Sequence, residues 1–451
     1  MKNVVIRSVT FFGIFLVLFL VITEIFKAKW INCYSNNIEP ATLIVDGFYE
    51  NKDELDVVFV GSSNVYENIN PLVLFEDYGI SSYDFATASQ TMSQTYSFTK
   101  EAIRLKKPKV IVLDVYGLMY NGNPREDRAR RSIDNIPLSI NKLEFIKNIV
   151  TGMDIKAISD YIFSIKRYHS RWTELSKDDY TYPLRDKHYS YRGHQPHFNT
   201  VSCDDLKYNE EVEFKGFTNL SKEYFIKIIE LCNKTNTSLV LIKSPNVNWK
   251  KVNSDEVNKI IKPYNIKFLD YAKNYKEIGI DVKDCFRDTG RHMNCKGVKI
   301  YTDAIGTYLK SNYQLKDYRN EEEFSQMKDD LEIYYQDIES YKLSQLKDVK
   351  QILEIVNSNE NYSVYYNVNQ VDINKYNNKF YQLLIQKGIN LTEDISGKNI
   401  TAESINNLLL GNKGINIIIY DNLTQRVVDN LSVTENLVLE REKKVIRESD
   451  L

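Results

Sequence analysis

The most prominent pattern along the chain is a run of apolar side chains near the N-terminus. No side chain between Ser8 and Thr23 is charged, and residues 11–22 are almost continuously apolar. With two further apolar residues, the run approaches the ~20 residues that a helix needs to cross ~30 Å of hydrocarbon. It predicts a transmembrane anchor at residues 1–29, with a cleaved signal peptide or a buried core helix as the alternatives.

The charges around this run are nearly balanced, with Lys2 and Arg7 before it and Lys27 and Lys29 after it. The orientation therefore depends on the short N-terminal flank and on the lack of a later apolar span. We expect a single-pass protein of the cell membrane, with the N-terminus inside and everything after Trp30 outside the cytoplasm.

Beyond a short polar connector, apolar runs alternate with amphipathic stretches. Runs at 56–61, 83–86, 110–114, 238–242 and 266–270 predict strands, and the patterns at 91–106, 222–233, near Asp255 and at 296–309 predict helices. Strands separated by helices at this spacing pair in parallel. The sequence therefore predicts an α/β fold, a three-layer α/β/α parallel-sheet domain at residues 50–315.

The strand rhythm is lost in an insertion at residues 117–219. An insertion beside strand ends is either a substrate-facing cover or a solvated helical excursion. Its arginines at positions 125, 128, 130 and 131 form a patch suited to an anionic polymer, but Glu126 and Asp127 within it favour a solvated helix face.

The C-terminal quarter has its own pattern. Apolar residues spaced by three and four predict a connecting amphipathic helix at 320–344. Residues 345–440 predict a small α/β domain with helices at 349–356, 375–387 and 402–410, strands at 362–368 and 415–420, and a charged, exposed tail at 440–444. Residues 414–429 resemble the interleukin-like inducer fold, which implies carbohydrate contact; an ordinary packing domain is the alternative.

Composition narrows the function. A net charge of −2 over 451 residues supplies no basic field, so a dedicated nucleic-acid binder is excluded. The five cysteines contain no C-x-x-C pair and make neither a zinc array nor a disulfide framework. Outside the cell, Cys285 and Cys295 would either pair or remain free thiols.

Two short segments carry candidate chemistry. Ser63 follows the first predicted strand in Gly61-Ser62-Ser63-Asn64, where glycine permits a sharp turn that presents a hydroxyl at the sheet edge. Far downstream, Asp288 and His292 lie in a loop just before the last helix of the domain. A hydroxyl nucleophile, an imidazole base and a carboxylate partner are the groups that acyl transfer needs.

These two segments resemble the SGNH (GDSL-like) superfamily of esterases and acyltransferases, whose first block is Gly-Asp-Ser-x and whose last is Asp-x-x-His. Gly61-Ser62-Ser63-Asn64 has the Gly-Ser-Ser form of the branch that includes teichoic-acid D-alanyl transfer proteins and alginate O-acetyltransferases. The resemblance spans residues 56–309. It implies Ser63 as nucleophile, His292 as base and Asp288 as its partner.

The chain departs from the family pattern in two places. Asp288 lies four residues before His292 instead of three, which leaves Thr289 at the usual position of the acid. No Gly-x-Asn-Asp block follows the third strand, so the usual asparagine donor to the oxyanion is missing. The resemblance implies the backbone N–H of Ala86 as one donor, with Gln90 or Asn64 in place of the asparagine.

The remaining histidines offer a weaker alternative. His194 and His197 have a spacing that suits a metal, but Pro196 breaks any helix between them and no nearby ligand completes a site. We expect no metal and no cofactor.

Taken with the anchor, the site predicts a membrane-anchored serine acyltransferase or esterase. It would add or remove acetyl or D-alanyl groups on a cell-surface polysaccharide, with a membrane-bound acyl-transfer protein as a further partner. The alternative is a catalytically inactive SGNH-like protein that binds glycan or acts as a scaffold in an envelope-assembly complex.

Overall fold

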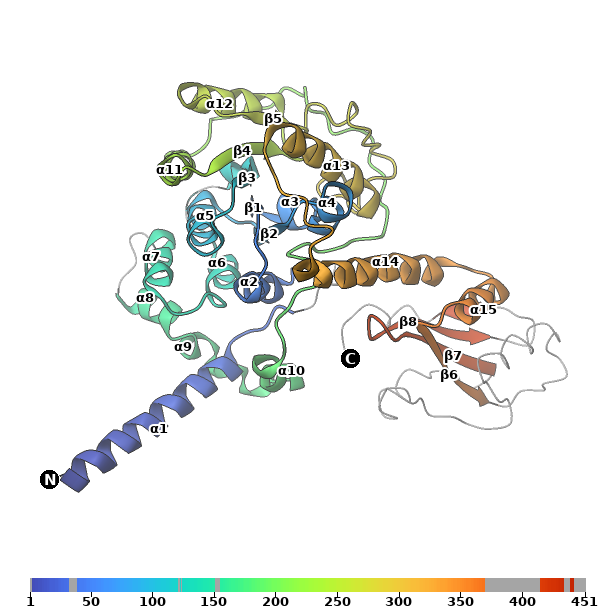
Figure 1. Ribbon diagram of the computed structural model, residues 1–451, viewed down its shortest axis with the longest axis horizontal. Helices are drawn as coiled ribbons and strands as arrows, with labels where there is room; N and C mark the ends of the chain where they lie inside the picture. Colours follow the sequence, from blue (N-terminus) through green and yellow to red (C-terminus); the bar gives the residue numbers. More distant parts are fainter. Residues whose placement is uncertain are drawn as a thin grey trace. The chain divides into compact units, whose positions relative to one another are not determined.

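The computed structural model divides the chain into two compact units, Met1–Ser325 and Gln326–Leu451. It describes residues 2–31, 39–120, 122, 124–150, 155–369, 414–433 and 439–441. The first unit contains the N-terminal helix and a parallel sheet, and the second contains an antiparallel sheet (Figure 1).

Helix α1 (Lys2–Phe26) forms where the apolar run predicts it. Its segment Asn3–Phe26 is long and apolar enough to cross a membrane, and its most apolar window is not buried by the rest of the chain. A signal sequence can have the same length and composition.

The first unit is built on a five-stranded parallel sheet with the order β2-β1-β3-β4-β5. The strands are β1 (Val57–Gly61), β2 (Ser82–Ala86), β3 (Val110–Asp114), β4 (Ser238–Lys243) and β5 (Phe268–Asp270). All residues of β1 and β3 are buried, as expected for central strands covered on both faces. Because β2 and β3 lie on opposite sides of β1, the strand order reverses there, which is where open α/β sheets bind their ligands.

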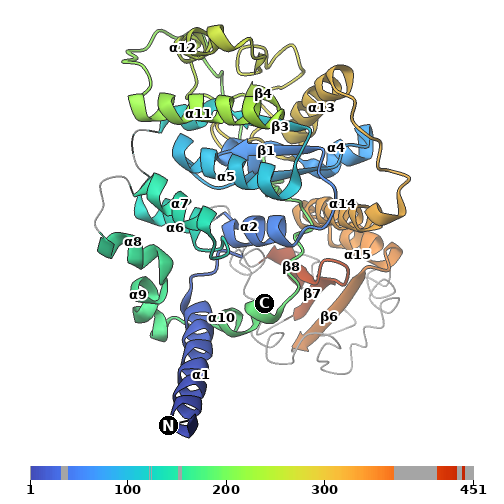
Figure 2. The same ribbon diagram turned by 60° about the vertical axis from the view of Figure 1, so that its left-hand side comes forward.

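Helices cover both faces of this sheet and confirm the three-layer α/β/α fold. Helices α5 (Met92–Lys106) and α11 (Asn219–Thr235) lie on one face, and α4 (Pro71–Tyr78) and α13 (Cys295–Asn312) lie on the other (Figures 1 and 2). Helix α12 (Lys251–Ile261) lies beyond β4.

The expected polar connector before the first strand is wrong in part. Ala41–Glu50 forms helix α2, and most of its residues are buried. The ring of Phe48 stacks on Phe85 of β2 with centroids 3.8 Å apart. The helix was missed because its ten residues are too few to show a helical period, although tertiary packing stabilises it.

Residues 125–184 of the insertion are mostly helical, and residues 185–218 contain no helix or strand. The insertion contains η1 (Val115–Met119), α6 (Glu126–Ile133), α7 (Ile140–Ile149), α8 (Ile155–Ile162), α9 (Ile165–Tyr168), η2 (His169–Thr173), α10 (Lys177–Thr181) and η3 (Tyr182–Leu184). Helix α7 packs on α5 through Phe145 and Phe98, whose ring centroids lie 5.7 Å apart. The end of the insertion reaches the site, since the N–H of Gln195 donates to the carbonyl of Tyr66 at 2.7 Å.

The arginines of the patch form ion pairs with acidic residues of the same unit. Arg128 and Arg131 both pair with Glu39, Arg130 with Asp134, and Arg125 with Asp127. Arg130 is also buried, with its guanidinium over the ring of Tyr161 at 4.2 Å. These contacts favour a structural role for the patch over a binding surface for an anionic polymer.

The second unit packs two helices on an antiparallel sheet with the order β6-β7-β8-β9. Its elements are α14 (Ser325–Gln345), α15 (Val349–Ser358), β6 (Tyr362–Asn369), β7 (Gly414–Asp421), β8 (Arg426–Val433) and β9 (Leu439–Arg441). Alternate residues of β7 face the helices, so Ile415, Ile417 and Ile419 join Ile352 and Leu353 in one core. The predicted helices at 375–387 and 402–410 lie outside the described residues.

The structure also bears on the predicted C-terminal tail and on the pair Cys285 and Cys295. Glu440 and Arg441, at the start of the predicted tail, belong to β9 and pair with β8, and the rest of that tail lies outside the described residues. Cys285 and Cys295 are not joined by a disulfide bond, which decides between the two alternatives. Burial raises the pKa of Cys285 to about 11, which keeps it protonated and unreactive.

Candidate active site

The hydroxyl of Ser63 is presented by a turn that requires glycine. β1 ends at Gly61, whose φ is +153°, and a Cβ there would lie 2.9 Å from Cγ2 of Val65 and 3.3 Å from the carbonyl of Asp114. Ser63 then begins the short helix α3 (Ser63–Tyr66). The strand end and the helix start therefore fix the position of Ser63 at the carboxyl edge of the sheet.

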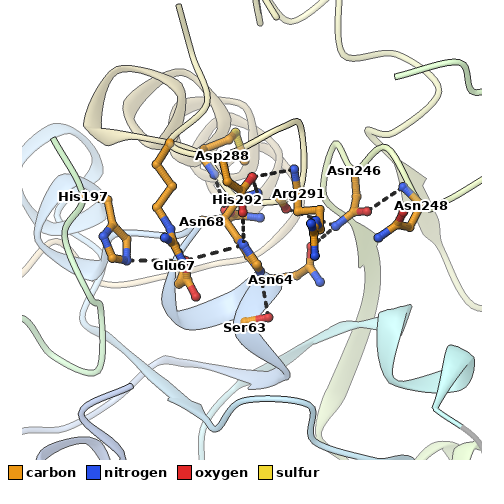
Figure 3. Close-up of polar contacts among 12 residues, drawn as sticks. Ser63, Asn64, Glu67, Asn68, His197, Asn246, Asn248, Asp288, Arg291 and His292 are labelled. Carbon is orange, nitrogen blue, oxygen red and sulfur yellow. Dashed lines mark hydrogen bonds and ion pairs between the residues drawn. The ribbon is translucent and has the colours of Figure 1, made fainter. Parts of the chain in front are cut away.

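Ser63, His292 and Asp288 form a continuous chain of hydrogen bonds. Nε2 of His292 lies 2.9 Å from Oγ of Ser63, and Nδ1 lies 2.7 Å from Oδ2 of Asp288 (Figure 3). A carboxylate can only accept, so Nδ1 carries the proton and the lone pair of Nε2 faces the hydroxyl. This is the tautomer that a general base needs to take a proton from serine.

The extra residue between Asp288 and His292 is absorbed by a tight loop. Gly290 has a φ of +85°, its N–H donates to the carbonyl of Asp288 at 2.7 Å, and its own carbonyl accepts from Val247 at 2.8 Å. Oδ1 of Asp288 accepts the backbone N–H groups of Arg291 and His292 at 2.8 and 2.9 Å. Burial alone would raise the pKa of Asp288, but its hydrogen bonds and the charge of His292 lower it, so the carboxylate stays ionised.

A second carboxylate lies behind the same imidazole. Oε2 of Glu67 is 3.8 Å from Nδ1 of His292 and 3.4 Å from Nε2 of His197, and Nε of Arg287 donates to it at 2.6 Å. Burial favours the protonated acid, yet His292, His197 and Arg287 together hold the pKa of Glu67 well below its usual range. The sequence placed neither Glu67 nor Arg287 in the site.

The side chain of Asn64 is held in place by residues that directly follow β4. Its Oδ1 accepts from Oγ of Ser244 at 2.9 Å and from Nδ2 of Asn246 at 3.0 Å. Nδ2 of Asn246 also donates to the carbonyl of Arg291 at 3.0 Å, so this asparagine joins the serine turn to the histidine loop. The Asn64 amide N–H is a buried donor without an acceptor among the described residues.

A buried ion pair lies beneath Asn64. Nζ of Lys243 is 3.5 Å from Oδ2 of Asp114, and both side chains are fully buried. The ammonium also lies over the rings of Tyr116 and Trp249, 5.0 and 5.6 Å from their centroids, and 3.5 Å from Oδ1 of Asn64. Burial lowers the pKa of Lys243, and the nearby carboxylates of Asp114 and Asp270 act against this. A positive charge next to Oδ1 polarises the Asn64 amide and strengthens its N–H donors.

The other two predicted oxyanion residues, Ala86 and Gln90, lie at the end of β2 and just after it, next to β1. Ala86 is the last residue of β2 and lies beside Gly61 in the sheet. Gln90 is fully buried, and its side-chain oxygen and nitrogen have no hydrogen bond within the described residues.

His194 and His197 contribute to the structure around the triad. Nδ1 of His194 lies 2.9 Å from the carbonyl of Tyr66, and burial lowers its pKa to about 3, so its imidazole is neutral. The carbonyl of His197 accepts the N–H of Cys295 at 2.7 Å, next to the histidine loop. Among the described residues, no group of three or more His, Cys, Asp or Glu could hold a metal ion.

A signal for two of the missed residues was present in the sequence. Lys243 and Asn246 follow a predicted parallel strand, and the carboxyl ends of such strands converge on one edge of the sheet.

Several solved structures are similar to this chain. A protein of the G-D-S-L family from Desulfitobacterium hafniense DCB-2 is 13% identical with a TM-score of 0.28, and it covers 56% of this chain and 97% of its own. The acetyl xylan esterase AlAXEase is 11% identical with a TM-score of 0.29 and covers 56% and 98%. A GDSL-like lipase from Bacteroides thetaiotaomicron VPI-5482 is 14% identical with a TM-score of 0.25 and covers 58% and 91%.

No protein-family model matches the sequence, and no curated protein resembles it closely enough to count as a match.

Proposed function

We propose that this chain is a membrane-anchored serine esterase or acyltransferase that acts outside the cytoplasm on a cell-surface polysaccharide. The single observation that carries the proposal is the hydrogen-bonded chain from Ser63 through His292 to Asp288. A separation of more than about 5 Å between Ser63 and the imidazole would have favoured the inactive scaffold.

The mechanism follows from this geometry. Oγ of Ser63 attacks the carbonyl carbon of an acyl donor while Nε2 of His292 takes the hydroxyl proton. Asp288 accepts the hydrogen bond from Nδ1 and stabilises the imidazolium that forms. The donor's alcohol leaves with the proton from Nε2, which gives an acyl ester on Ser63. A sugar hydroxyl or water then loses its proton to Nε2, attacks this ester and releases Ser63.

In this proposal, the side-chain amide of Asn64 donates to the negative oxygen of the tetrahedral intermediate. Its buried amide N–H has no acceptor among the described residues, its oxygen accepts from Ser244 and Asn246, and the Lys243 ammonium lies next to that oxygen. A preorganised donor of this kind is typically worth about 3 kcal/mol of transition-state stabilisation. It compensates for the asparagine that is missing after β3.

The assignment to a surface polymer combines this chemistry with helix α1. A serine acyl-transfer domain tethered to a bilayer by its N-terminus would act on polymers built at that surface. The resemblance carried by the Gly-Ser-Ser turn favours acetyl or D-alanyl as the acyl group. A membrane-bound protein would supply this group from the cytoplasm.

Mass spectrometry of surface polymers tests this assignment. Cells carrying Ser63→Ala should lose the same acyl groups as cells lacking the protein, whereas Ser311→Ala, an exposed serine at the end of α13, should leave them unchanged. Unchanged acylation with Ser63→Ala would overturn the enzymatic proposal and favour the scaffold.

The topology has a separate test. A membrane-impermeant thiol reagent should label Lys234→Cys, an exposed position on α11, in intact cells and above the level of the parent chain. Labelling only after lysis would place the domain on the cytoplasmic side.

A further inference from the structure

The exposed apolar side chains of the first unit are concentrated in one part of the insertion. Outside α1, the described large hydrophobic residues that are more than half exposed all lie between positions 138 and 184. Four exposed residues occur around α9 and α10 and are called here the α9–α10 surface: Phe163, Trp172, Tyr180 and Leu184, which are 45%, 71%, 52% and 88% exposed. Side chains of this size are normally buried, so their clustering indicates a binding surface.

This surface adjoins the apolar helix itself. The ring of Phe163 lies edge-to-face on Phe19 of α1, with centroids 6.1 Å apart and planes at 63°. Phe19 lies seven residues before the end of α1 at Phe26, which is about 10 Å along the helix axis. If α1 crosses a bilayer, Phe163 therefore lies at the depth of the acyl chains.

Polar contacts hold the surface at the point where α1 ends. Nη1 of Arg171 donates to the carbonyl of Phe26 at 2.7 Å, and Nη2 donates to Oδ1 of Asp179 at 3.0 Å. Nζ of Lys29 lies 3.7 Å from the same carboxylate, whose side chain is only 3% exposed. In both views α9 and α10 lie beside this end of α1 (Figures 1 and 2).

The composition of the segment matches a membrane interface. Tryptophan and tyrosine are enriched where hydrocarbon meets headgroups, and Trp172 and Tyr180 are exposed here. Residues 163–184 contain four Lys and Arg against three Asp and Glu, so electrostatic attraction to lipid is weak. Burial of the apolar side chains in the bilayer therefore supplies most of the binding free energy, and a bilayer of zwitterionic lipid is sufficient as the partner.

We propose that the α9–α10 surface docks on the bilayer beside α1, with Phe163 and Trp172 inserted below the headgroups. A single helix would leave the domain free to tilt and rotate on its anchor. A second attachment through the insertion fixes the orientation of the catalytic unit to the membrane. This inference depends on α1 lying in a bilayer and does not depend on the chemistry of Ser63.

Depth-dependent fluorescence quenching tests the docking. The full chain carrying Trp172→Phe is reconstituted in phosphatidylcholine vesicles with or without bromine on the acyl chains, and one tryptophan is added in turn. The three positions are Phe163→Trp on the surface, Leu16→Trp within α1, and Val212→Trp as the control. Val212 is 43% exposed, close to Phe163. Val212 is four residues after Tyr208, and the carbonyl of Tyr208 accepts the N–H of Lys251 at the start of α12. In both views α12 lies at the far end of the first unit from α1.

Docking predicts that brominated lipid quenches the added fluorescence of Phe163→Trp to the same extent as that of Leu16→Trp, and does not quench that of Val212→Trp. Quenching of Leu16→Trp without quenching of Phe163→Trp would overturn the docking and leave the anchor intact. No quenching of Leu16→Trp would show that α1 is outside the bilayer and would overturn both. Equal quenching of Val212→Trp would show that the surface is not selective and would contradict the proposal.

Discussion

Oε2 of Glu67 lies 3.8 Å from Nδ1 of His292, so a second carboxylate faces the nitrogen that already donates to Asp288. Glu67 is buried and also pairs with Arg287 and His197. The cluster places negative charge beside the imidazolium that would form during catalysis and fixes the serine turn against the histidine loop.

Glu67→Gln is expected to destabilise the protein by about 3–5 kcal/mol at pH 7, because it leaves the Arg287 guanidinium partly buried without its counter-charge. The folded-state pKa of Glu67 lies below the ordinary value of 4.5. Its carboxylate therefore stabilises the fold above that pH, and the contribution is lost as the pH falls toward the folded-state pKa.

The difference in free energy of unfolding between the wild type and Glu67→Gln should thus stay constant from pH 7 to about 4.5 and decrease as the pH falls below that value. Glu230→Gln, on the exposed face of α11, is the matched control and should change stability by less than about 0.5 kcal/mol. A difference between wild type and Glu67→Gln that does not depend on pH would contradict the ionised state of this carboxyl.

Asp288→Asn should slow the reaction at Ser63 by a factor on the order of 10⁴, because an amide at this position can reverse the tautomer of His292. The neighbouring Thr289 occupies the position where the family pattern has its acid, and its side chain is exposed. Thr289→Ala should leave the rate of Ser63 acylation by p-nitrophenyl acetate unchanged. A larger loss in Thr289→Ala than in Asp288→Asn would show that the hydrogen bond to Asp288 is not the functional one.

Gly61→Ala should cost about 1–3 kcal/mol and also displace Ser63, because the added methyl meets Val65 and the Asp114 carbonyl at a positive φ. Gly216 also has a positive φ, +85°, but a Cβ there meets nothing within 4 Å. Gly216→Ala therefore carries only the backbone cost, about 1 kcal/mol, and should retain full activity. Thermal unfolding measures the stability of each variant, and ester turnover measures its activity. Equal losses of stability and activity in Gly61→Ala and Gly216→Ala would exclude the steric role of Gly61.

Much of the fold could be predicted because buried parallel strands are continuous apolar runs bounded by turns. All five strands of the parallel sheet lie within two residues of the predicted ranges. Helix α2 could not be predicted, since its stability comes from contacts such as Phe48 on Phe85 that join distant parts of the sequence. Likewise, the internal pairing of Arg128 and Arg131 depends on Glu39, almost 90 residues earlier.

The same distinction holds for the site. Ser63, Asp288 and His292 could be named because each lies in a short segment with its own signature, and the structure brings all three together. Glu67 has no such signature, and Asn246 has only its position after a predicted strand. Their place in the site follows from the turn after α3 and from the convergence of β1 and β4 on the same edge, which only the three-dimensional arrangement specifies.

The most direct measurement of the proposed chemistry is covalent labelling of Ser63 in the full-length protein by a fluorophosphonate. The probe forms an Oγ–P bond and loses fluoride only where a serine is activated by a base. Peptide mass spectrometry should find the label on Ser63 in the wild type and in Ser311→Ala, and on no residue in Ser63→Ala or His292→Ala. A folded wild-type protein that remains unlabelled, or a label that persists in Ser63→Ala, would contradict an activated nucleophile at this position.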